Sequence, residues 1–294
     1  MSKRFFNVAV AATALAVLSG CSAGTLGISD IAPTSSRDAK ATVTITTFVV
    51  PPPGEASPTT VTPDLRTQLQ SVADSVAMYY GGTVGIAVAG GGQVVSAGDD
   101  AAYPAWSTIK VPISVAAYRS DPQLAREYAP PAIRASDNAA AEQMWINLDP
   151  EQVNQVLAEA TVGVAVNTEK VRPEFSTYGQ TLLSTSQEAV IASHLACLAE
   201  AEPVIALMGQ VNSEQAYGLG RLPGAALKVG WGPDTSGRYQ VRQLARVTRS
   251  DGATSAIALT VIPAAGDYGT AQAMADEVAN GLSLLLDSLP EADC

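Results

Sequence analysis

The sequence predicts an α/β domain of the α+β type, in which an antiparallel sheet is flanked by an N-terminal and a C-terminal helix. Three observations lead to this prediction. Short strand-like segments separated by turn residues occur in two groups, one early and one late in the chain. A block of helical patterns separates the two groups, and amphipathic helices precede the first and follow the second. That order is typical of a sheet built from both ends of a domain, with a helical region inserted between them.

The early group begins with an amphipathic helix at residues 64–80, whose apolar positions include Leu65 and Leu69. Two glycines follow the helix and are expected to end it. Short strands are then expected at 83–89 and 93–97. The three consecutive glycines between these strands are typical of a hairpin.

The remaining elements form the helical block and the late group. A Ser-Asp-Gly turn is expected between the last two strands. The expected elements are, in order, helices at 107–119, 132–147, 150–160 and 185–199, strands at 226–231, 239–249 and 254–262, and a helix at 269–289.

Composition and charge limit the classes of function. Hydrophobic residues make up 47% of the 294 residues, which is enough for a sizeable core. The formal net charge of −11 argues against a nucleic acid as partner, because binding to a phosphate backbone needs a Lys/Arg patch. One histidine and three cysteines exclude most zinc sites, and we expect no metal and no cofactor.

The N-terminus has the pattern of a secretory signal peptide. Lys3 and Arg4 precede an apolar run that is too short to span a bilayer as a mature helix. The run ends in Leu-Ser-Gly-Cys, which resembles the bacterial lipobox, and the resemblance implies that residues 1–20 are removed and Cys21 is lipidated. The alternative is an ordinary secretory signal with an incidental cysteine. Loss of Lys3 and Arg4, two of the 17 basic residues, would change the net charge from −11 to −13.

A tether is expected at 21–62, because this segment is rich in Ser, Thr, Ala, Pro and Gly. The domain itself is expected at 63–294. Acyl chains on Cys21 would anchor this domain to the cell membrane, facing outside the cytoplasm. The sequence indicates no oligomeric state.

The first stretch that could carry chemistry is Ser107-Thr108-Ile109-Lys110, at the start of a predicted helix. The helix dipole favours developing negative charge at a serine in this position, and a lysine three residues later lies on the same helix face. A desolvated lysine loses its proton more readily and can then act as the base for a serine nucleophile. The alternative is a capping serine beside a solvated lysine.

The second stretch is Ser136-Asp137-Asn138, where the hydroxyl could relay a proton and the amide could bind a substrate carbonyl. The alternative is helix N-capping, for which all three residue types are favoured.

The third stretch is Lys228-Val229-Gly230, on a predicted strand. The cation could pair with a substrate carboxylate, and the glycine lets a substrate backbone approach; the alternative is an edge-strand lysine. From residue 63 onward the chain has only three lysines, Lys110, Lys170 and Lys228, and two of them fall inside these stretches.

In this order, the three stretches resemble the motifs Ser-x-x-Lys, Ser-Asp-Asn and Lys-Thr/Ser-Gly of the serine β-lactamase and penicillin-binding D,D-peptidase superfamily, with the class A β-lactamase-like branch nearest. The resemblance covers roughly residues 63–294. It implies that Ser107 is acylated, that Lys110 is its base and that Ser136 passes the proton to the leaving group. It also implies that Asn138 holds a substrate amide and that Lys228 neutralises a substrate carboxylate.

The same resemblance implies an oxyanion hole made of two backbone N–H groups. One belongs to Ser107 and the other to Trp231 or Gly232. Such donors contribute about 3 kcal/mol each in the transition state.

Two departures concern substrate binding and the size of the helical region. Val229 stands where the superfamily has a hydroxyl residue, and it cannot hydrogen-bond a carboxylate. Arg242 on the next predicted strand could compensate, since its guanidinium fits carboxylates; the alternative is an exposed strand charge. Ser107 and Ser136 are only 29 positions apart, so the inserted helical region is reduced, or the second motif is a coincidence.

A third departure concerns deacylation. The candidates for a water-activating carboxylate are Glu169 and Glu174, and neither lies in the superfamily's Glu-x-x-Leu-Asn setting. The alternative for both is a solvated loop residue. Without such a carboxylate an acyl-enzyme would hydrolyse slowly, which argues against an efficient β-lactamase.

Two cysteines, Cys197 and Cys294, remain once Cys21 is lipidated, and outside the cytoplasm an even pair suggests a disulfide. The leading hypothesis for function is a membrane-anchored serine hydrolase that acts on a carboxylate-bearing amide or ester, such as a cell-wall peptide or a β-lactam. One alternative is a lipoprotein that keeps the fold, lacks turnover and binds an envelope ligand. Another is a purely structural lipoprotein.

Overall fold

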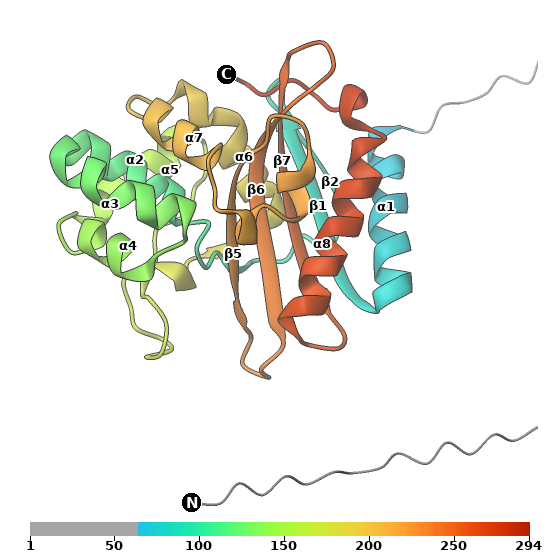
Figure 1. Cartoon of the computed structure of the whole chain (residues 1–294), viewed down its shortest axis with the longest axis horizontal. Helices are drawn as coiled ribbons and strands as arrows, with labels where there is room; N and C mark the ends of the chain where they lie inside the picture. Colours follow the sequence, from blue (N-terminus) through green and yellow to red (C-terminus); the bar gives the residue numbers. More distant parts are fainter. Residues whose placement is uncertain (1–63) are drawn as a thin grey trace, which may run out of the picture. The chain divides into compact units, whose positions relative to one another are not determined.

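The computed structural model describes residues 64–294, which form a five-stranded antiparallel sheet with helices on both faces (Figure 1). The strand order is β2-β1-β7-β6-β5, so the early hairpin pairs with the late strands and β5 lies at one end. This confirms the predicted α+β class and antiparallel sheet. The expected signal peptide, Cys21 and the expected tether lie outside the described residues. The strands are β1 (Gly82–Gly90), β2 (Gln93–Gly98), β5 (Ala226–Pro233), β6 (Tyr239–Thr248) and β7 (Thr254–Pro263).

One face of the sheet is covered by α1 (Leu65–Tyr80) and α8 (Tyr268–Ser283), the two helices expected at the ends of the domain. Asp64 caps α1 and Asp267 caps α8, each by accepting a hydrogen bond from a backbone N–H in the first turn. Between these helices and the sheet lies a buried apolar cluster that includes Leu69 and Met274.

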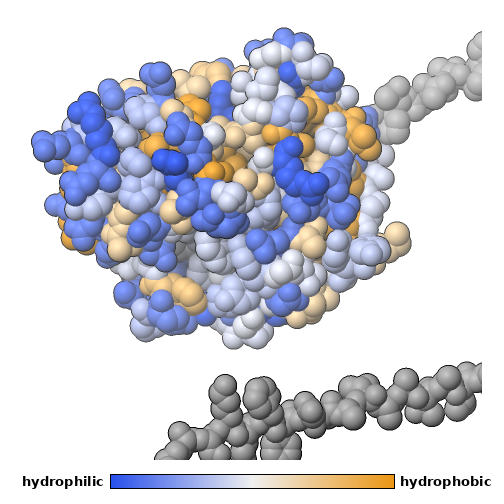
Figure 2. Space-filling model, in the orientation of Figure 1, coloured by the Kyte–Doolittle hydropathy of each residue, from blue (hydrophilic) through white to orange (hydrophobic). Residues whose placement is uncertain are grey.

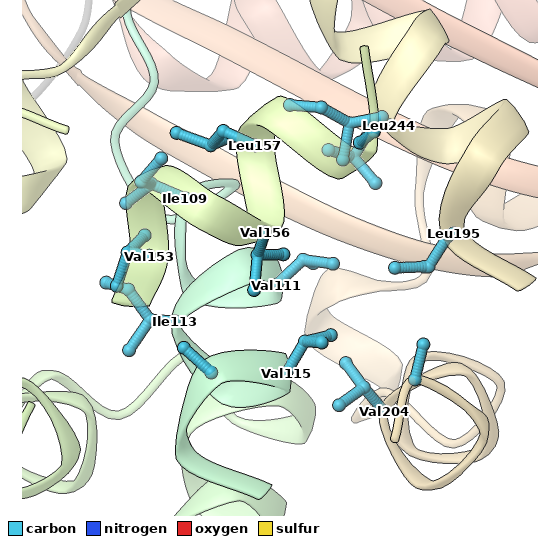
Figure 3. Close-up of a cluster of buried hydrophobic side chains, with 14 of the residues drawn as sticks. Ile109, Val111, Ile113, Val115, Val153, Val156, Leu157, Leu195, Val204 and Leu244 are labelled. Carbon is cyan, nitrogen blue, oxygen red and sulfur yellow. The ribbon is translucent and has the colours of Figure 1, made fainter. Parts of the chain in front are cut away.

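The opposite face is covered by the inserted helical region, which has its own apolar core (Figure 3). Its central helix runs through this core with almost every side chain buried, from Lys110 to Tyr118. The apolar residues Ile109, Val111 and Val115 pack in this cluster. The helices of the region are α2 (Lys110–Ser120), α3 (Pro122–Arg134), α4 (Asn138–Trp145), α5 (Pro150–Glu159), α6 (Thr185–His194) and α7 (Glu202–Met208).

The helical region differs from the prediction at three places. The helix expected at 132–147 is two helices, α3 and α4, which are separated by a turn containing Ser136. Helix α3 contains Pro130 and Pro131, which disfavour a helical prediction although tertiary packing accommodates them here. Helix α7 was not expected. A small sheet that was also not expected pairs β3 (Tyr103–Pro104) with β4 (Leu182–Leu183), and strands of two residues carry no readable pattern.

The C-terminal tail is fixed to the helical region by a disulfide between Cys197 and Cys294, the pair suggested by the cysteine count. Arg246 of β6 reinforces this attachment by donating to the carbonyl oxygens of Ala192 and Cys294. On the face drawn in Figure 2, hydrophilic residues predominate and hydrophobic residues form small separate patches. Among the described helices, none combines the length and the hydropathy that crossing a membrane requires.

Candidate active site

Ser107 lies in the turn between β3 and α2, and α2 begins only at Lys110. The preceding residue, Trp106, has a φ of 53°, in the left-handed region that residues with a side chain rarely adopt. Its backbone N–H donates to the carbonyl oxygen of Gly179 at 2.8 Å. Backbone strain of this kind persists only where neighbouring structure enforces it, and it is common at functional sites.

Lys110 places its amine among three acceptors of the second motif. The Nζ atom donates to the Asn138 side-chain oxygen at 2.7 Å and to the backbone oxygens of Ser136 at 2.6 Å and Asp137 at 3.3 Å. The Lys110 side chain is 1% exposed. The first two motifs therefore meet, although 26 residues separate Lys110 from Ser136.

Lys228 reaches the same place from the sheet. Its Nζ atom donates to the Ser136 hydroxyl at 2.8 Å and to the backbone oxygen of Val229 at 2.8 Å, and its side chain is fully buried. Ser136 has a φ of 59°, which gives its short turn the shape that lets the backbone face Lys110 while the hydroxyl faces Lys228. All three sequence motifs thus meet at Ser136.

Burial lowers the pKa of both amines. Desolvation lowers the pKa of Lys110 to about 7, against a smaller opposing effect of Asp137. Desolvation also lowers the pKa of Lys228 well below its ordinary value, and the nearby positive charge of Lys110 lowers it further. The lowered pKa makes the neutral form of Lys110, which can accept a proton, accessible near neutral pH, and the amine gives up one of its three donated hydrogen bonds when it adopts that form.

Gly230 brings β5 against the turn that carries the serine. A Cβ atom at this position would lie 2.6 Å from the carbonyl oxygen of Ala105 and 2.9 Å from the backbone nitrogen of Ser107. Two positions further on, a Cβ at Gly232 would lie 2.7 Å from the Trp106 ring. Only glycine allows this close approach at either position. The approach places β5, which is the last strand of the five-stranded sheet, beside Ser107.

Two groups of Ser107 have no hydrogen-bond partner within residues 64–294: its backbone N–H and its hydroxyl. The backbone N–H of Ser107 lies beside β5 and is free to donate a hydrogen bond to an oxyanion. The free hydroxyl also means that Lys110 does not hydrogen-bond Ser107 in this state, because its amine is directed at the three acceptors of the second motif. Catalytic hydrogen bonds are often formed only when substrate is present.

Comparison with known proteins gives matches among solved structures. No protein-family model matches the chain, and no curated protein matches it either. A class A β-lactamase from Bacteroides cellulosilyticus matches with a TM-score of 0.61 at 15% identity, over 76% of this chain and 98% of that one. A β-lactamase from Sphaerobacter thermophilus matches with a TM-score of 0.61 at 16% identity, over 76% and 98%. A β-lactamase from Chitinophaga pinensis matches with a TM-score of 0.60 at 16% identity, over 74% and 98%.

The chain has the fold of the class A β-lactamases. The expected resemblance in fold is thereby confirmed, over 74 to 76% of the chain. At 15 to 16% sequence identity, the similarity to these β-lactamases shows a shared fold and nothing more. Any chemistry proposed for this chain must therefore be argued from the side chains of this chain.

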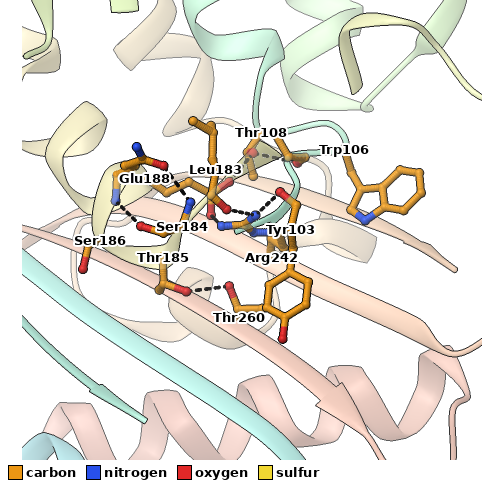
Figure 4. A network of polar contacts seen from close by, with 12 residues as sticks. Tyr103, Trp106, Thr108, Leu183, Ser184, Thr185, Ser186, Glu188, Arg242 and Thr260 are labelled. Carbon is orange, nitrogen blue, oxygen red and sulfur yellow. Dashed lines mark hydrogen bonds and ion pairs between the residues drawn. The ribbon is translucent and has the colours of Figure 1, made fainter. Parts of the chain in front are cut away.

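Arg242 does not have the position expected of a substrate-binding residue (Figure 4). Its guanidinium is 0% exposed and donates to the backbone oxygens of Tyr103 at 2.7 Å and Leu183 at 2.6 Å. It also forms an ion pair of 2.9 Å with the buried carboxylate of Glu188. The expectation for Arg242 is corrected: the register places it opposite Gly230, but its side chain is enclosed beneath the small sheet and cannot meet a substrate.

Glu188 is a residue that the sequence did not single out. Its carboxylate accepts a hydrogen bond of 2.5 Å from Thr108, the residue after the candidate nucleophile (Figure 4). Burial raises the pKa of Glu188, and the guanidinium of Arg242 opposes this effect. Glu188 and Arg242 together hold both sides of the turn that carries Ser107. The only sign of Glu188 in the sequence is that a charged residue stands among the apolar positions on the buried face of α6.

The two candidate glutamates lie on the exposed loop between α5 and β4. Glu174 is paired with Arg172 at 3.1 Å, and hydrogen bonds lower the pKa of its carboxyl group. In the part of the chain that the structure describes, neither Glu169 nor Glu174 has a side-chain hydrogen bond to a motif residue. A role for either glutamate in deacylation stays a prediction.

Val229, which stands where the superfamily has a hydroxyl residue, is fully buried in the core beneath α8.

Proposed function

We propose that this protein is a serine hydrolase that is acylated at Ser107 by an amide or ester substrate. One observation carries the proposal: Lys110 and Lys228, from a helix and a strand that are far apart in the chain, donate to the two oxygens of a single serine, Ser136. Burying two lysines beside each other is costly, and clusters of perturbed amines mark functional sites more often than structural ones.

The roles follow from the contacts. Neutral Lys110 accepts the proton of Ser107 as its oxygen attacks the substrate carbonyl. The N–H groups of Ser107 and of β5, at Trp231 or Gly232, stabilise the oxyanion. Ser136, oriented by Lys228, passes its proton to the departing amine or alkoxide and takes a proton back from the protonated Lys110, so that the proton of Ser107 ends on the leaving group and both Lys110 and Ser136 are restored. Asn138 fixes Lys110 and offers its amide to the substrate.

We also propose that lipid on Cys21 attaches this domain to the cell membrane, outside the cytoplasm. The support is the apolar run that ends at this cysteine and the polar segment 21–62 that separates it from the domain.

The experiment is intact-mass measurement after incubation with a neutral fluorophosphonate, for the wild type and Ser107→Ala. The phosphorus of the probe bonds to the serine oxygen and fluoride leaves, so the wild type is expected to gain one adduct and the variant none. A wild type that is folded by circular dichroism and gains no adduct would contradict the proposal and favour a ligand-binding protein without turnover.

A further inference from the structure

The backbone direction along β5 determines which of its groups face the Ser107 turn. In an antiparallel pair, successive residues of a strand direct their N–H and C=O groups to opposite edges. The N–H of Asp234 donates to the carbonyl oxygen of Arg238, on the side of β6. Pro233, one residue earlier, therefore directs its carbonyl oxygen to the opposite edge, where β5 has no neighbouring strand. Trp231 directs its N–H to that same edge, so this N–H is the β5 group that can meet an oxyanion.

Arg172 holds this edge of β5. It lies on the loop between α5 and β4, and its guanidinium donates to the carbonyl oxygen of Pro233 at 2.5 Å. A hydrogen bond from a charged donor is stronger than one between neutral groups. The carboxylate of Glu174 contacts the same guanidinium at 3.1 Å. Because the Pro233 oxygen and the Trp231 N–H lie two residues apart on one edge, the bond from Arg172 restrains the strand beside the candidate oxyanion donor.

The same guanidinium is linked to the Ser107 turn through two aromatic rings. Its central carbon lies 4.3 Å from the centroid of the Phe175 ring, in a cation–π contact. The Phe175 ring meets the Trp106 ring edge-on, with 5.0 Å between the centroids. Trp106 immediately precedes Ser107, and its ring packs against Gly232 of β5. Loss of Arg172 would therefore loosen the side chain that keeps the Ser107 turn against the strand.

The backbone of Arg172 is also fixed in place. Its N–H donates to the side-chain oxygen of Gln180 at 2.8 Å, and its carbonyl oxygen accepts from the side-chain nitrogen of Gln180 at 3.1 Å. Gln180 is buried and follows Gly179, whose carbonyl oxygen accepts from the N–H of Trp106. The loop that carries Arg172 and the turn that carries Ser107 are thus tied together by their backbones as well.

We propose that Arg172 is a positioning residue, which holds the backbone N–H groups of Ser107 and Trp231 at the separation that one oxyanion requires. This inference rests on the proposed function. In that reaction the Ser107 oxygen bonds to the substrate carbonyl carbon, and an electron pair moves to the carbonyl oxygen, which accepts from both N–H groups. The pair returns as the bond to the leaving group breaks. Arg172 acts on one donor through Pro233 and on the other through Phe175.

The test is the rate of Ser107 labelling by a neutral fluorophosphonate, measured across pH for the wild type and Arg172→Ala. The phosphoryl oxygen of the probe gains negative charge during the attack and would be bound by the same two N–H groups. The rate at high pH is expected to fall by about 10- to 10²-fold, which is less than the loss of a whole donor. The pH midpoint should not move, because Arg172 makes no contact with Lys110 or its three acceptors.

Arg119→Ala is the matched control. Arg119 also donates to a backbone oxygen, that of Ala199 at 3.0 Å, and pairs with a glutamate, Glu159, at 2.8 Å. Its side chain is 21% exposed, against 24% for Arg172. It lies near the end of α2 that is farther from Lys110, so Arg119→Ala should label at the wild-type rate.

Chemical rescue distinguishes positioning from a general loss of structure. Guanidinium ion fits the space left between Pro233 and Phe175 in Arg172→Ala. At concentrations far below those that unfold the protein, it is expected to restore labelling of this variant in a saturable manner. It should not accelerate labelling of the wild type or of Arg119→Ala.

The possible outcomes separate the two proposals. A folded Arg172→Ala that labels as fast as Arg119→Ala overturns the inference and leaves the serine hydrolase standing. A slower rate that guanidinium does not restore, or a displaced pH midpoint, also overturns it. Absence of an adduct on the Ser107 of the folded wild type overturns the proposed function, and the inference with it.

Arg172→Lys decides the question if Arg172→Ala does not fold. Lysine keeps the charge beside Glu174, but it lacks the planar group that stacks on Phe175 while donating to Pro233. A folded Arg172→Lys with a lower rate at high pH and an unchanged midpoint supports the inference. The wild-type rate in this variant overturns it.

Discussion

Lys110→Met is expected to slow the reaction of Ser107 with a fluorophosphonate by about 10²- to 10⁴-fold, the range associated with loss of a general base. The buried amine, with its pKa near 7, is the group in the site best suited to take the serine proton at neutral pH. Methionine has a similar length and fills the same buried space. The measurement is the rate of adduct formation, followed by intact mass.

The matched control is Lys170→Met. Lys170 is exposed on the loop between α5 and β4 and is the only lysine from residue 63 onward that lies outside the three motifs, so its loss should leave the rate unchanged. Thermal unfolding shows whether Lys110→Met is folded. A folded Lys110→Met protein that reacts at the wild-type rate would show that another group activates the serine.

Gly230→Ala is expected to reduce the labelling rate by about 10²-fold or more, since misplacement of a reacting group by about 1 Å has effects of this size. The added methyl group would lie 2.6 Å from the carbonyl oxygen of Ala105 and 2.9 Å from the nitrogen of Ser107. Both atoms are backbone, so the turn must move away from β5. Overpacking of this kind also costs about 1–3 kcal/mol of stability, which urea unfolding would measure.

Gly163→Ala is the control for this substitution, because no atom lies within 4 Å of a Cβ built at that glycine. It should change neither the labelling rate nor the stability appreciably. If Gly230→Ala labelled as fast as Gly163→Ala, the close contact between β5 and the Ser107 turn would have no part in the reaction.

The sheet and its two covering helices could be predicted from the sequence because their patterns are long and regular. The turn glycines at 90–92 and the apolar positions of residues 64–80 were sufficient for the early group. The helical region was harder to predict. Pro130 and Pro131 argued locally against a helix, and the packing of α3 against its neighbours outweighs that preference. The short spacing between Ser107 and Ser136 is accommodated by α2 and α3 alone.

The site could be predicted where three short motifs each placed a chemical group, and the structure brings Lys110, Ser136, Asn138 and Lys228 together. Arg242 was misread because a strand residue opposite Gly230 can face either an open cleft or a closed layer. The alternation of side chains along a strand predicts on which face of the sheet Arg242 lies, but it does not predict which elements cover that face. The partner that encloses it, Glu188, lies 54 residues away on α6 and carries no motif.

The pH dependence of Ser107 labelling tests the central claim most directly. The base must be neutral, and the pKa of Lys110 is about 7, so the rate should rise with pH through about 7 and level off above it. Lys110→Met should lose this step. A rate in the wild type that does not change between about pH 5.5 and pH 9, or that rises only near the ordinary lysine pKa of about 10.4, would contradict the assignment of Lys110 as the base that activates Ser107.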